Sequence, residues 1–299
     1  MTPPLQTDST VPYHWLPQAA EPRIPLVFDS PHSWPHWPAD VETVARTEQL
    51  MTSCDAYVDE LWRGVTAVGG ALLAARFHRA YIDANRHERD IDPDLIDGVW
   101  PEPIERSEMS RRGMGLIRRY ALPRVPMYGR RLSVGEVRDR IEGCYRPYRR
   151  TLGEAIGKAH ARFGTVWHVN CHSMKSVGNA MNVDCGAPRP DIVVSNSPRG
   201  EPSASDEFTR WVADRLSRYG YKVAINTPYT GGDIVHAHGR PHEQRHSVQI
   251  EINRALYINE ATVVKHAGFD RLQGHLDLFT RELADYVETS LAAGPRLAA

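Results

Sequence analysis

The segment VWHVNCHS, residues 166–173, begins with an apolar run and ends in polar side chains. A short run of β-branched and aromatic residues is typical of a buried strand. We therefore predict a strand over TVWHV, residues 165–169, with the polar NCHS group at its carboxyl end. His172 is then either a hydrogen-bonded structural histidine or a side chain that binds a ligand.

Similar apolar runs recur along the chain and alternate with segments of helical period. The predicted strands are IPLVF (24–28), ALLAA with the following AYIDA (71–84), TVWHV (165–169), DIVVS (191–195), YKVAI (221–225) and SVQIEI (247–252). The predicted helices are VARTEQLM (44–51), DAYVDELWRGVTAV (55–68), residues 134–163, SASDEFTRWVADRLSRY (203–219) and residues 269–291. Pro147 should kink or split the third helix, because proline lacks a backbone donor. This alternation predicts an α/β fold in which helices flank a mixed sheet.

Size and charge narrow the class of protein. The 299 residues, 41% of them hydrophobic, predict one domain over residues 1–299, with its core at about 24–290. The 36 basic side chains nearly balance the 37 acidic ones, which argues against nucleic acid or a membrane as partner and favours a small-molecule substrate. The oligomeric state stays open.

Neither a signal peptide nor a membrane-spanning segment is recognisable, so we expect a cytoplasmic protein. The four cysteines are widely spaced, which predicts reduced thiols. Residues 91–126 are rich in proline, glycine and charge and predict a long irregular excursion of the kind that covers a site. TPYTGGD (227–233) predicts a flexible turn able to lie over a pocket.

The candidate site is predicted from polar residues that follow the strands, because open α/β sheets bind ligands at the carboxyl ends of their strands. These residues include His32, Asn85, Arg86 and His172. Zinc commonly binds two imidazoles and one carboxylate. Asp55 is the candidate carboxylate, although an aspartate at this position is equally expected as the N-cap of the helix that follows.

Glu251 lies in SVQIEINRALY, where apolar and polar side chains alternate and therefore face opposite sides of a strand. One interpretation places Glu251 on the solvent face of an edge strand. The other makes it a general base that takes a proton from a metal-bound water. Arg79 and Arg86 have the guanidinium groups that suit carboxylates, although each alone is also typical of a surface salt bridge.

A competing metal site is possible in HAHGRPHEQRH, residues 236–246, where His236 and His238 are close in sequence. No phosphate-binding loop, dinucleotide-binding fingerprint or G-x-S-x-G motif is present.

The ordered motifs DSPHS, CDAYVDELW, YIDANR, VNCHS, PYTGGDIVHAHGRP and VQIEINRALYINE resemble those of the N-formylglutamate amidohydrolases. The resemblance extends from about residue 24 to 260. That family is similar in fold to the zinc carboxypeptidases and the aspartoacylases. The resemblance implies a zinc-carboxypeptidase-like fold and the hydrolysis of N-formyl-L-glutamate to formate and glutamate, a late step of histidine breakdown.

The resemblance also implies roles for individual residues. The zinc ligands would be His32, Asp55 and His172, and Glu251 would be the catalytic carboxylate. The resemblance further implies that Asn85 and Arg86 hold a substrate carboxylate, and that Arg79 polarises the scissile carbonyl.

Two departures from the family pattern bear on the substrate. Trp34 stands where members of the family often have a glycine, and Trp37 follows soon after. The mouth of the pocket is therefore expected to differ in shape from that of other family members. His236 lies near the position of a frequent arginine and would bind a second substrate carboxylate less well. Two functional alternatives therefore remain: a hydrolase of another N-acyl amino acid or of a peptide, and a non-catalytic metal- or ligand-binding protein. Manganese and cobalt remain alternatives to zinc as the bound metal.

Overall fold

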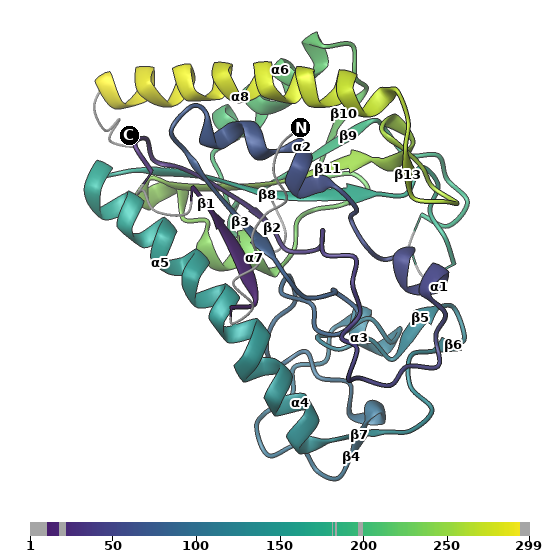
Figure 1. Ribbon diagram of the computed structural model, residues 1–299. Coiled ribbons are helices and arrows are strands. Elements are labelled where there is room, and N and C mark those ends of the chain that lie inside the picture. Colours follow the sequence, from purple (N-terminus) through teal and green to yellow (C-terminus); the bar gives the residue numbers. More distant parts are fainter. Residues whose placement is uncertain (1–10, 18–21, 181, 183, 197–199, 294–299) are drawn as a thin grey trace.

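A seven-stranded mixed sheet forms the centre of the computed structural model (Figure 1). The structure describes residues 11–17, 22–180, 182, 184–196 and 200–293. In order across the sheet, the strands are β1 (Tyr13–Leu16), β3 (Ala71–Ala75), β2 (Leu26–Ser30), β8 (Val166–Met174), β11 (Arg245–Asn253), β9 (Ile192–Ser195) and β10 (Val223–Ile225). β3, β2, β8 and β11 are parallel, whereas β1, β9 and β10 run in the opposite direction.

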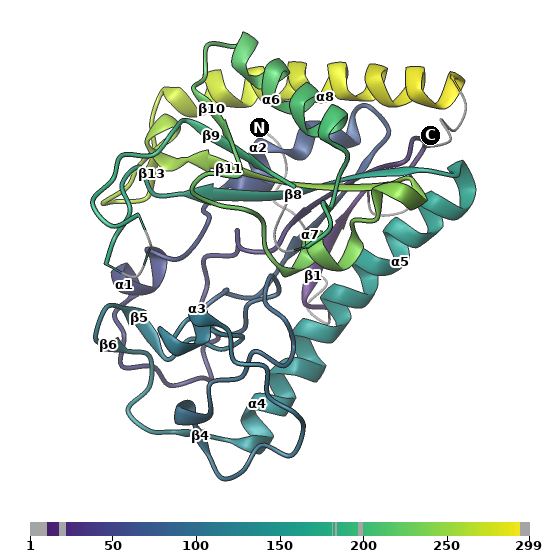
Figure 2. The same cartoon turned by 180° about the vertical axis from the view of Figure 1, so that it is seen from behind.

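Helices cover both faces of this sheet (Figures 1 and 2). One face carries α2 (Val58–Leu61), α6 (Asp206–Arg218) and α8 (Gly268–Ala292). The other face carries α5 (Arg146–Phe163) and α7 (Asp233–His238). The predicted α/β class, with a mixed sheet between helices, is confirmed. That the whole chain forms a single domain stays a prediction.

The long third helix is interrupted where the sequence predicts. α4 (Val134–Arg140) leads through a π-helical turn, Ile141–Tyr145, into α5, and Pro147 lies in the first turn of α5. A proline in the first turn costs no internal hydrogen bond, and the wider π turn accommodates the break in the helical pattern.

The two faces of the central strands differ sharply in chemistry. Val169 and Cys171 of β8 and Ile250 of β11 point into the apolar core beneath α2, α6 and α8. The alternate residues, among them His168 and His172, are buried on the opposite face. Strand periodicity thus assembles a row of polar side chains on the α5–α7 face of the sheet.

The predicted irregular excursion forms a layer beside the carboxyl ends of the strands, in the lower half of Figure 1. Its short elements are β4 (Ile96–Asp97), α3 (Glu108–Arg111), β5 (Tyr120–Leu122) and β6 (Val125–Pro126). β7 (Leu132–Ser133) follows the excursion and pairs with β4, and α1 (Thr47–Met51) packs against β5. The remaining elements are β12 (Ile258–Asn259), β13 (Val264–Lys265) and the 3-10 turns Arg63–Thr66, Pro93–Leu95, Pro241–Glu243 and Arg254–Leu256.

Two strand predictions differ from the structure, and one strand of the main sheet was not predicted. Residues 80–84 form no strand, since the chain turns there with the amide of Tyr81 donating to the carbonyl of His78. The NCHS group lies inside β8 rather than after it. β1 was not predicted from the sequence.

All four cysteines are free, as predicted. Among the helices of the described ranges, none has the length and apolar composition needed to cross a bilayer.

Candidate metal centre and active-site pocket

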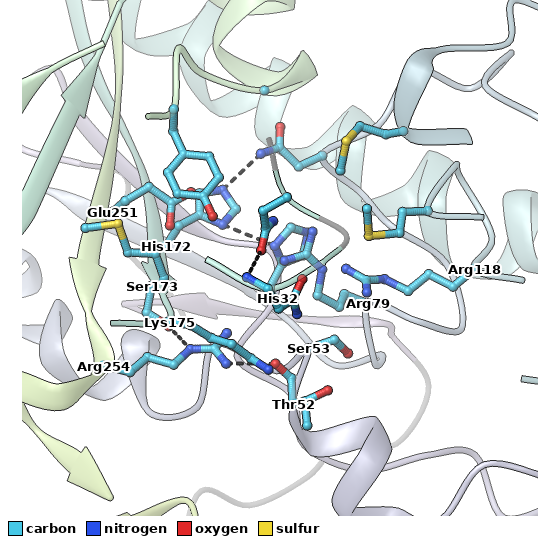
Figure 3. A pocket seen from close by; sticks show the side chains of 18 of the residues that line it. His32, Thr52, Ser53, Arg79, Arg118, His172, Ser173, Lys175, Glu251 and Arg254 are labelled. Atoms are coloured by element: carbon cyan, nitrogen blue, oxygen red, sulfur yellow. Dashed lines mark hydrogen bonds between the residues drawn. The ribbon is translucent and has the colours of Figure 1, made fainter. Parts of the chain in front are cut away.

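Three buried side chains from distant parts of the chain converge at one point. His32 follows β2, Asp55 precedes α2, and His172 lies near the carboxyl end of β8. Nδ1 of His172 lies 3.1 Å from Nδ1 of His32 and 3.0 Å from Oδ2 of Asp55. Nδ1 of His32 lies 3.5 Å from the same carboxylate oxygen. The predicted convergence of these three residues is therefore present (Figure 3 shows both histidines).

Polar side chains contact Nε2 of each imidazole, on the side away from the shared space. Nε2 of His32 donates to Oδ1 of Asp83 at 2.6 Å. Nε2 of His172 donates to Oδ1 of Asn170 at 2.7 Å, because the amide nitrogen of Asn170 is turned to Asp29 and donates to that carboxylate. The Nδ1 atom of each imidazole therefore faces the shared space.

The chemistry of this donor set fits a divalent metal ion. The pKa of Asp55 lies well below its ordinary value: burial opposes this shift, but the hydrogen bonds with His172 and His32 and the charge of Arg254 outweigh it. The two imidazole nitrogens and the carboxylate oxygen lie within 4.8 Å of one another in a buried space, an arrangement that a cation would stabilise. The His32–Asp55–His172 group could hold a metal ion, and several transition metals accept such ligands.

Asp55 does not serve as a helix cap, so that alternative is wrong. No side chain caps α2, whose preceding residue is Tyr57. One oxygen of Asp55 instead accepts from Arg254 at 2.8 Å, and the other faces the two histidines. Arg254 thereby aims the carboxylate at the site.

Glu251 lies on β11 directly across from His172 on β8. Because β11 runs between β8 and β9, the edge-strand interpretation of this segment is wrong. Glu251 is only 7% exposed, and Gln249 donates to its carboxylate at 2.9 Å. Burial raises the pKa of Glu251, which suits a group that must accept a proton near neutral pH.

The predicted arginines lie at the same pocket. Arg79 forms an ion pair with Asp83 at 2.8 Å and lies 3.9 Å from Asp55. Arg86 donates from Nε to the carbonyl of Met114 at 3.2 Å. Both side chains line the pocket, where they are available to a ligand.

Asn85 also lines the pocket, but other protein groups already engage its amide. Its oxygen accepts from the amide of Ile234 at 2.9 Å, and its nitrogen lies 3.0 Å from Nε2 of His172 and 3.3 Å from the side-chain oxygens of Asn170 and Gln249. Asn85 thus ties the glycine-rich loop before α7 to β8 and β11.

The pocket has a volume of about 180 Å³ and is lined in part by the two segments predicted to cover a site. Met109, Met114 and Arg118 come from the irregular excursion, and Tyr229 and Gly232 come from the turn before α7.

Three residues expected near the pocket are not among those that line it. His236 is exposed on α7. Trp34 packs against His36, and Trp37 packs against Tyr81. The expected change at the pocket mouth therefore does not arise from the two tryptophans.

The competing metal site in residues 236–246 does not form. His236 points to solvent, whereas the ring of His238 packs 6.2 Å from that of His168. Both belong to α7, and residues two apart on a helix face different directions. In the described part of the chain, His32, Asp55 and His172 form the one group of at least three His, Cys, Asp or Glu side chains with ligand geometry.

Several residues of the site were not singled out from sequence: Asp83, Arg118, Asn170, Gln249 and Arg254. Asp83 orients both His32 and Arg79, and its presence in YIDANR was a signal that could have been used. Arg118 lies in the irregular excursion, where no periodicity marks it.

Comparisons with known proteins agree with this geometry. A family model described as N-formylglutamate amidohydrolase matches residues 24–258. N-formylglutamate deformylase of Pseudomonas aeruginosa is 24% identical over 242 residues, which cover 80% of this chain and 84% of that protein.

Two solved structures are also similar. The crystal structure of N-formylglutamate amidohydrolase from Ralstonia eutropha JMP134 is 42% identical with a TM-score of 0.87, covering 93% of this chain and 99% of that chain. A gene product of Agrobacterium tumefaciens shares the fold at 16% identity, with a TM-score of 0.62 and coverage of 95% of this chain and 96% of its own.

Proposed function

Because this chain belongs to the N-formylglutamate amidohydrolase family, we propose that it hydrolyses the amide bond of an N-formyl amino acid, with N-formyl-L-glutamate as substrate and formate and glutamate as products. The observation that carries the proposal is the convergence of His32, Asp55 and His172 beside the buried Glu251. Two imidazoles, a carboxylate and a second buried carboxylate beside them are the groups that metal-assisted hydrolysis of an amide uses.

The metal ligands in this proposal are Nδ1 of His32, a carboxylate oxygen of Asp55 and Nδ1 of His172, and zinc is the proposed ion. A divalent metal held there supplies a water of lowered pKa and polarises a substrate carbonyl. Asp83 holds His32 in the required tautomer, and Asn170 does so for His172.

Glu251 acts as the general base and then as the general acid. Its carboxylate accepts a proton from the attacking water and later delivers this proton to the departing amine nitrogen. Gln249 keeps the carboxylate turned toward the pocket by donating to one of its oxygens. Burial of Glu251 increases its affinity for a proton, which favours this transfer.

Arg79 stabilises the negative charge that develops on the carbonyl oxygen, and its ion pair with Asp83 holds it at the pocket wall. Arg86 lies on the same wall and binds a carboxylate of the amino-acid end. Asn85 has a positioning role in this proposal, because its amide bonds to Ile234 and Gln249 and so holds the glycine-rich loop before α7 beside the pocket.

The test is formate release from N-formyl-L-glutamate by the purified protein loaded with defined metals. A panel of N-formyl, N-acetyl and N-succinyl amino acids runs in parallel. Preference for an N-formyl substrate would support the proposal. A preference for another acyl group would point to a different deacylase, and no hydrolysis in any case would point to a binding protein.

A further inference from the structure

Arg118 is a buried cation whose guanidinium lacks an internal counter-ion. Its side chain enters the pocket from the excursion layer, opposite Glu251, and its guanidinium points toward Arg79 and His32 (Figure 3). The residue is 8% exposed, and no described acceptor bonds to its buried Nε atom. Within the described ranges no carboxylate lies at ion-pair distance from Arg118.

Three other arginines of the pocket differ from Arg118 in this respect. Arg79 is paired with Asp83, Arg254 with Asp55, and Arg189 with Asp184 at 2.7 Å. The nearby carboxylates are therefore engaged by other cations, and Glu251 lies across the pocket. Burying a charge without a partner raises the free energy of the folded protein, so an anion that enters the pocket would stabilise the guanidinium of Arg118 most.

The backbone holds Arg118 firmly in this position. A bridge joins Met114 to Arg118, and Arg86 bonds to the carbonyl of Met114. The carbonyl of Asp90 accepts from the amide of Leu116 at 2.9 Å within the same turn. A guanidinium on such a fixed turn can accept a planar carboxylate at little entropic cost.

Electrostatics favour the same conclusion. Burial, together with the adjacent positive charges of Arg79 and Arg86, lowers the pKa of Arg118 to about 9. Arg118 still carries its charge at neutral pH, but in an unfavourable environment that a carboxylate would relieve.

We propose that Arg118 binds a carboxylate of the substrate and so makes the pocket selective for N-acyl derivatives of acidic amino acids. This inference rests on the proposed hydrolase function. Together, Arg86 and Arg118 provide two guanidinium groups, which matches an amino acid that has both an α-carboxylate and a side-chain carboxylate. His236 is exposed on α7, so its replacement of a frequent family arginine does not remove this site.

The first test compares Arg118→Met and Arg118→Lys with wild type on N-formyl-glutamate and on its two monoamides, in which either carboxylate is neutral. We expect Arg118→Met to raise KM at least tenfold for the diacid while kcat changes little. The penalty should vanish for the one monoamide that lacks the bound carboxylate, which identifies that carboxylate. The KM of Arg118→Lys for the diacid should lie between those of wild type and Arg118→Met, because lysine keeps the positive charge but cannot donate two parallel hydrogen bonds to a carboxylate.

Two further measurements separate a binding role from a structural one. Without ligand, the melting temperature of Arg118→Met should equal or exceed that of wild type, since the substitution removes an unpaired buried charge. Arg111→Met, an exposed change on α3, is the matched control and should leave KM unaltered.

Titration calorimetry with glutamate tests the site even if the wild type proves inactive on formyl substrates. We expect Arg118→Met to bind glutamate at least tenfold more weakly than wild type. Equal binding by the two proteins, an equal KM penalty on all three substrates, or a lowered melting temperature would overturn the proposal.

Discussion

Glu251 and His172 occupy paired positions on two parallel strands, β11 and β8, and their side chains lie on the same face of the sheet. The pairing continues toward the amino ends of the strands, where Gln249 is opposite Asn170. The proposed general base, a proposed metal ligand and the residues that orient each of them are therefore positioned by one strand register. A one-residue slip of β11 would turn Glu251 into the apolar core.

Glu251→Gln should abolish turnover without releasing metal. Glutamine keeps the shape of the side chain but cannot accept the proton, so we expect kcat to fall by roughly 10²–10⁴-fold. Elemental analysis by mass spectrometry should show the same metal content as wild type. A variant with near-normal turnover would refute the assigned role.

His172→Ala should lose the metal. The substitution removes one of three ligands, so zinc should no longer raise the melting temperature, whereas it raises that of the wild type by stabilising only the folded state. The control is His242→Ala, which removes an exposed histidine. Equal zinc-induced shifts in all three proteins would place the metal elsewhere.

Asp83→Asn should weaken metal binding although Asp83 is no ligand. The substitution removes the carboxylate that orients His32 and pairs with Arg79. We expect metal affinity to fall by about 10- to 100-fold, as measured by competition with a chromophoric chelator. Asp97→Asn, an exposed change on β4, is the control. Unchanged affinity in Asp83→Asn would show that Asp83 does not act through His32.

Gly232→Ala should lower activity by displacing Asn85. A Cβ atom on Gly232 would lie 2.4 Å from Nδ2 of Asn85, so the amide must move and the loop over the pocket must shift. We expect kcat/KM to fall by roughly 10- to 10²-fold. Gly157→Ala on α5 meets no atom within 4 Å and should keep full activity. Full activity in both variants would mean that the loop tolerates the shift.

Stability should fall in mild acid because of His246. Burial lowers the pKa of His246 to about 4, whereas a histidine in the unfolded chain has its ordinary pKa of 6.5. Between these values the unfolded chain binds a proton that the folded protein excludes, so the free energy of unfolding decreases as pH falls, by about 1.4 kcal/mol per pH unit for this group.

Denaturant unfolding at pH 7 and pH 5 checks this pH dependence. The loss of stability between the two values should be smaller in His246→Gln than in wild type. His242→Gln, which changes an exposed histidine, should behave as wild type. An unchanged loss in His246→Gln would exclude His246 as its source.

Hydrophobic periodicity predicted most of the sheet, and with it His32 and His172, because apolar runs and their polar ends are local features. It did not predict residues 80–84 correctly. Ile82 and Ala84 are buried as strand residues would be, but Asp83 is held in a turn by tertiary partners that no local pattern reveals.

Other parts of the site depend on long-range packing. Arg118 lies in an excursion without periodicity, and its burial is set by the layer that packs beside the sheet. His236 was predicted at the pocket from its place in a motif, but the turn of α7 directs it to solvent. The roles assigned to individual residues stay predictions until the variants are measured.

The central claim is that one metal ion binds between His32, Asp55 and His172, and anomalous diffraction from zinc-loaded crystals at the zinc absorption edge tests it most directly. We expect one strong peak within bonding distance of Nδ1 of His32, Nδ1 of His172 and a carboxylate oxygen of Asp55. A peak bound by other side chains, or no peak between these three residues in zinc-saturated protein, would contradict the proposed metal centre and the hydrolytic mechanism built on it.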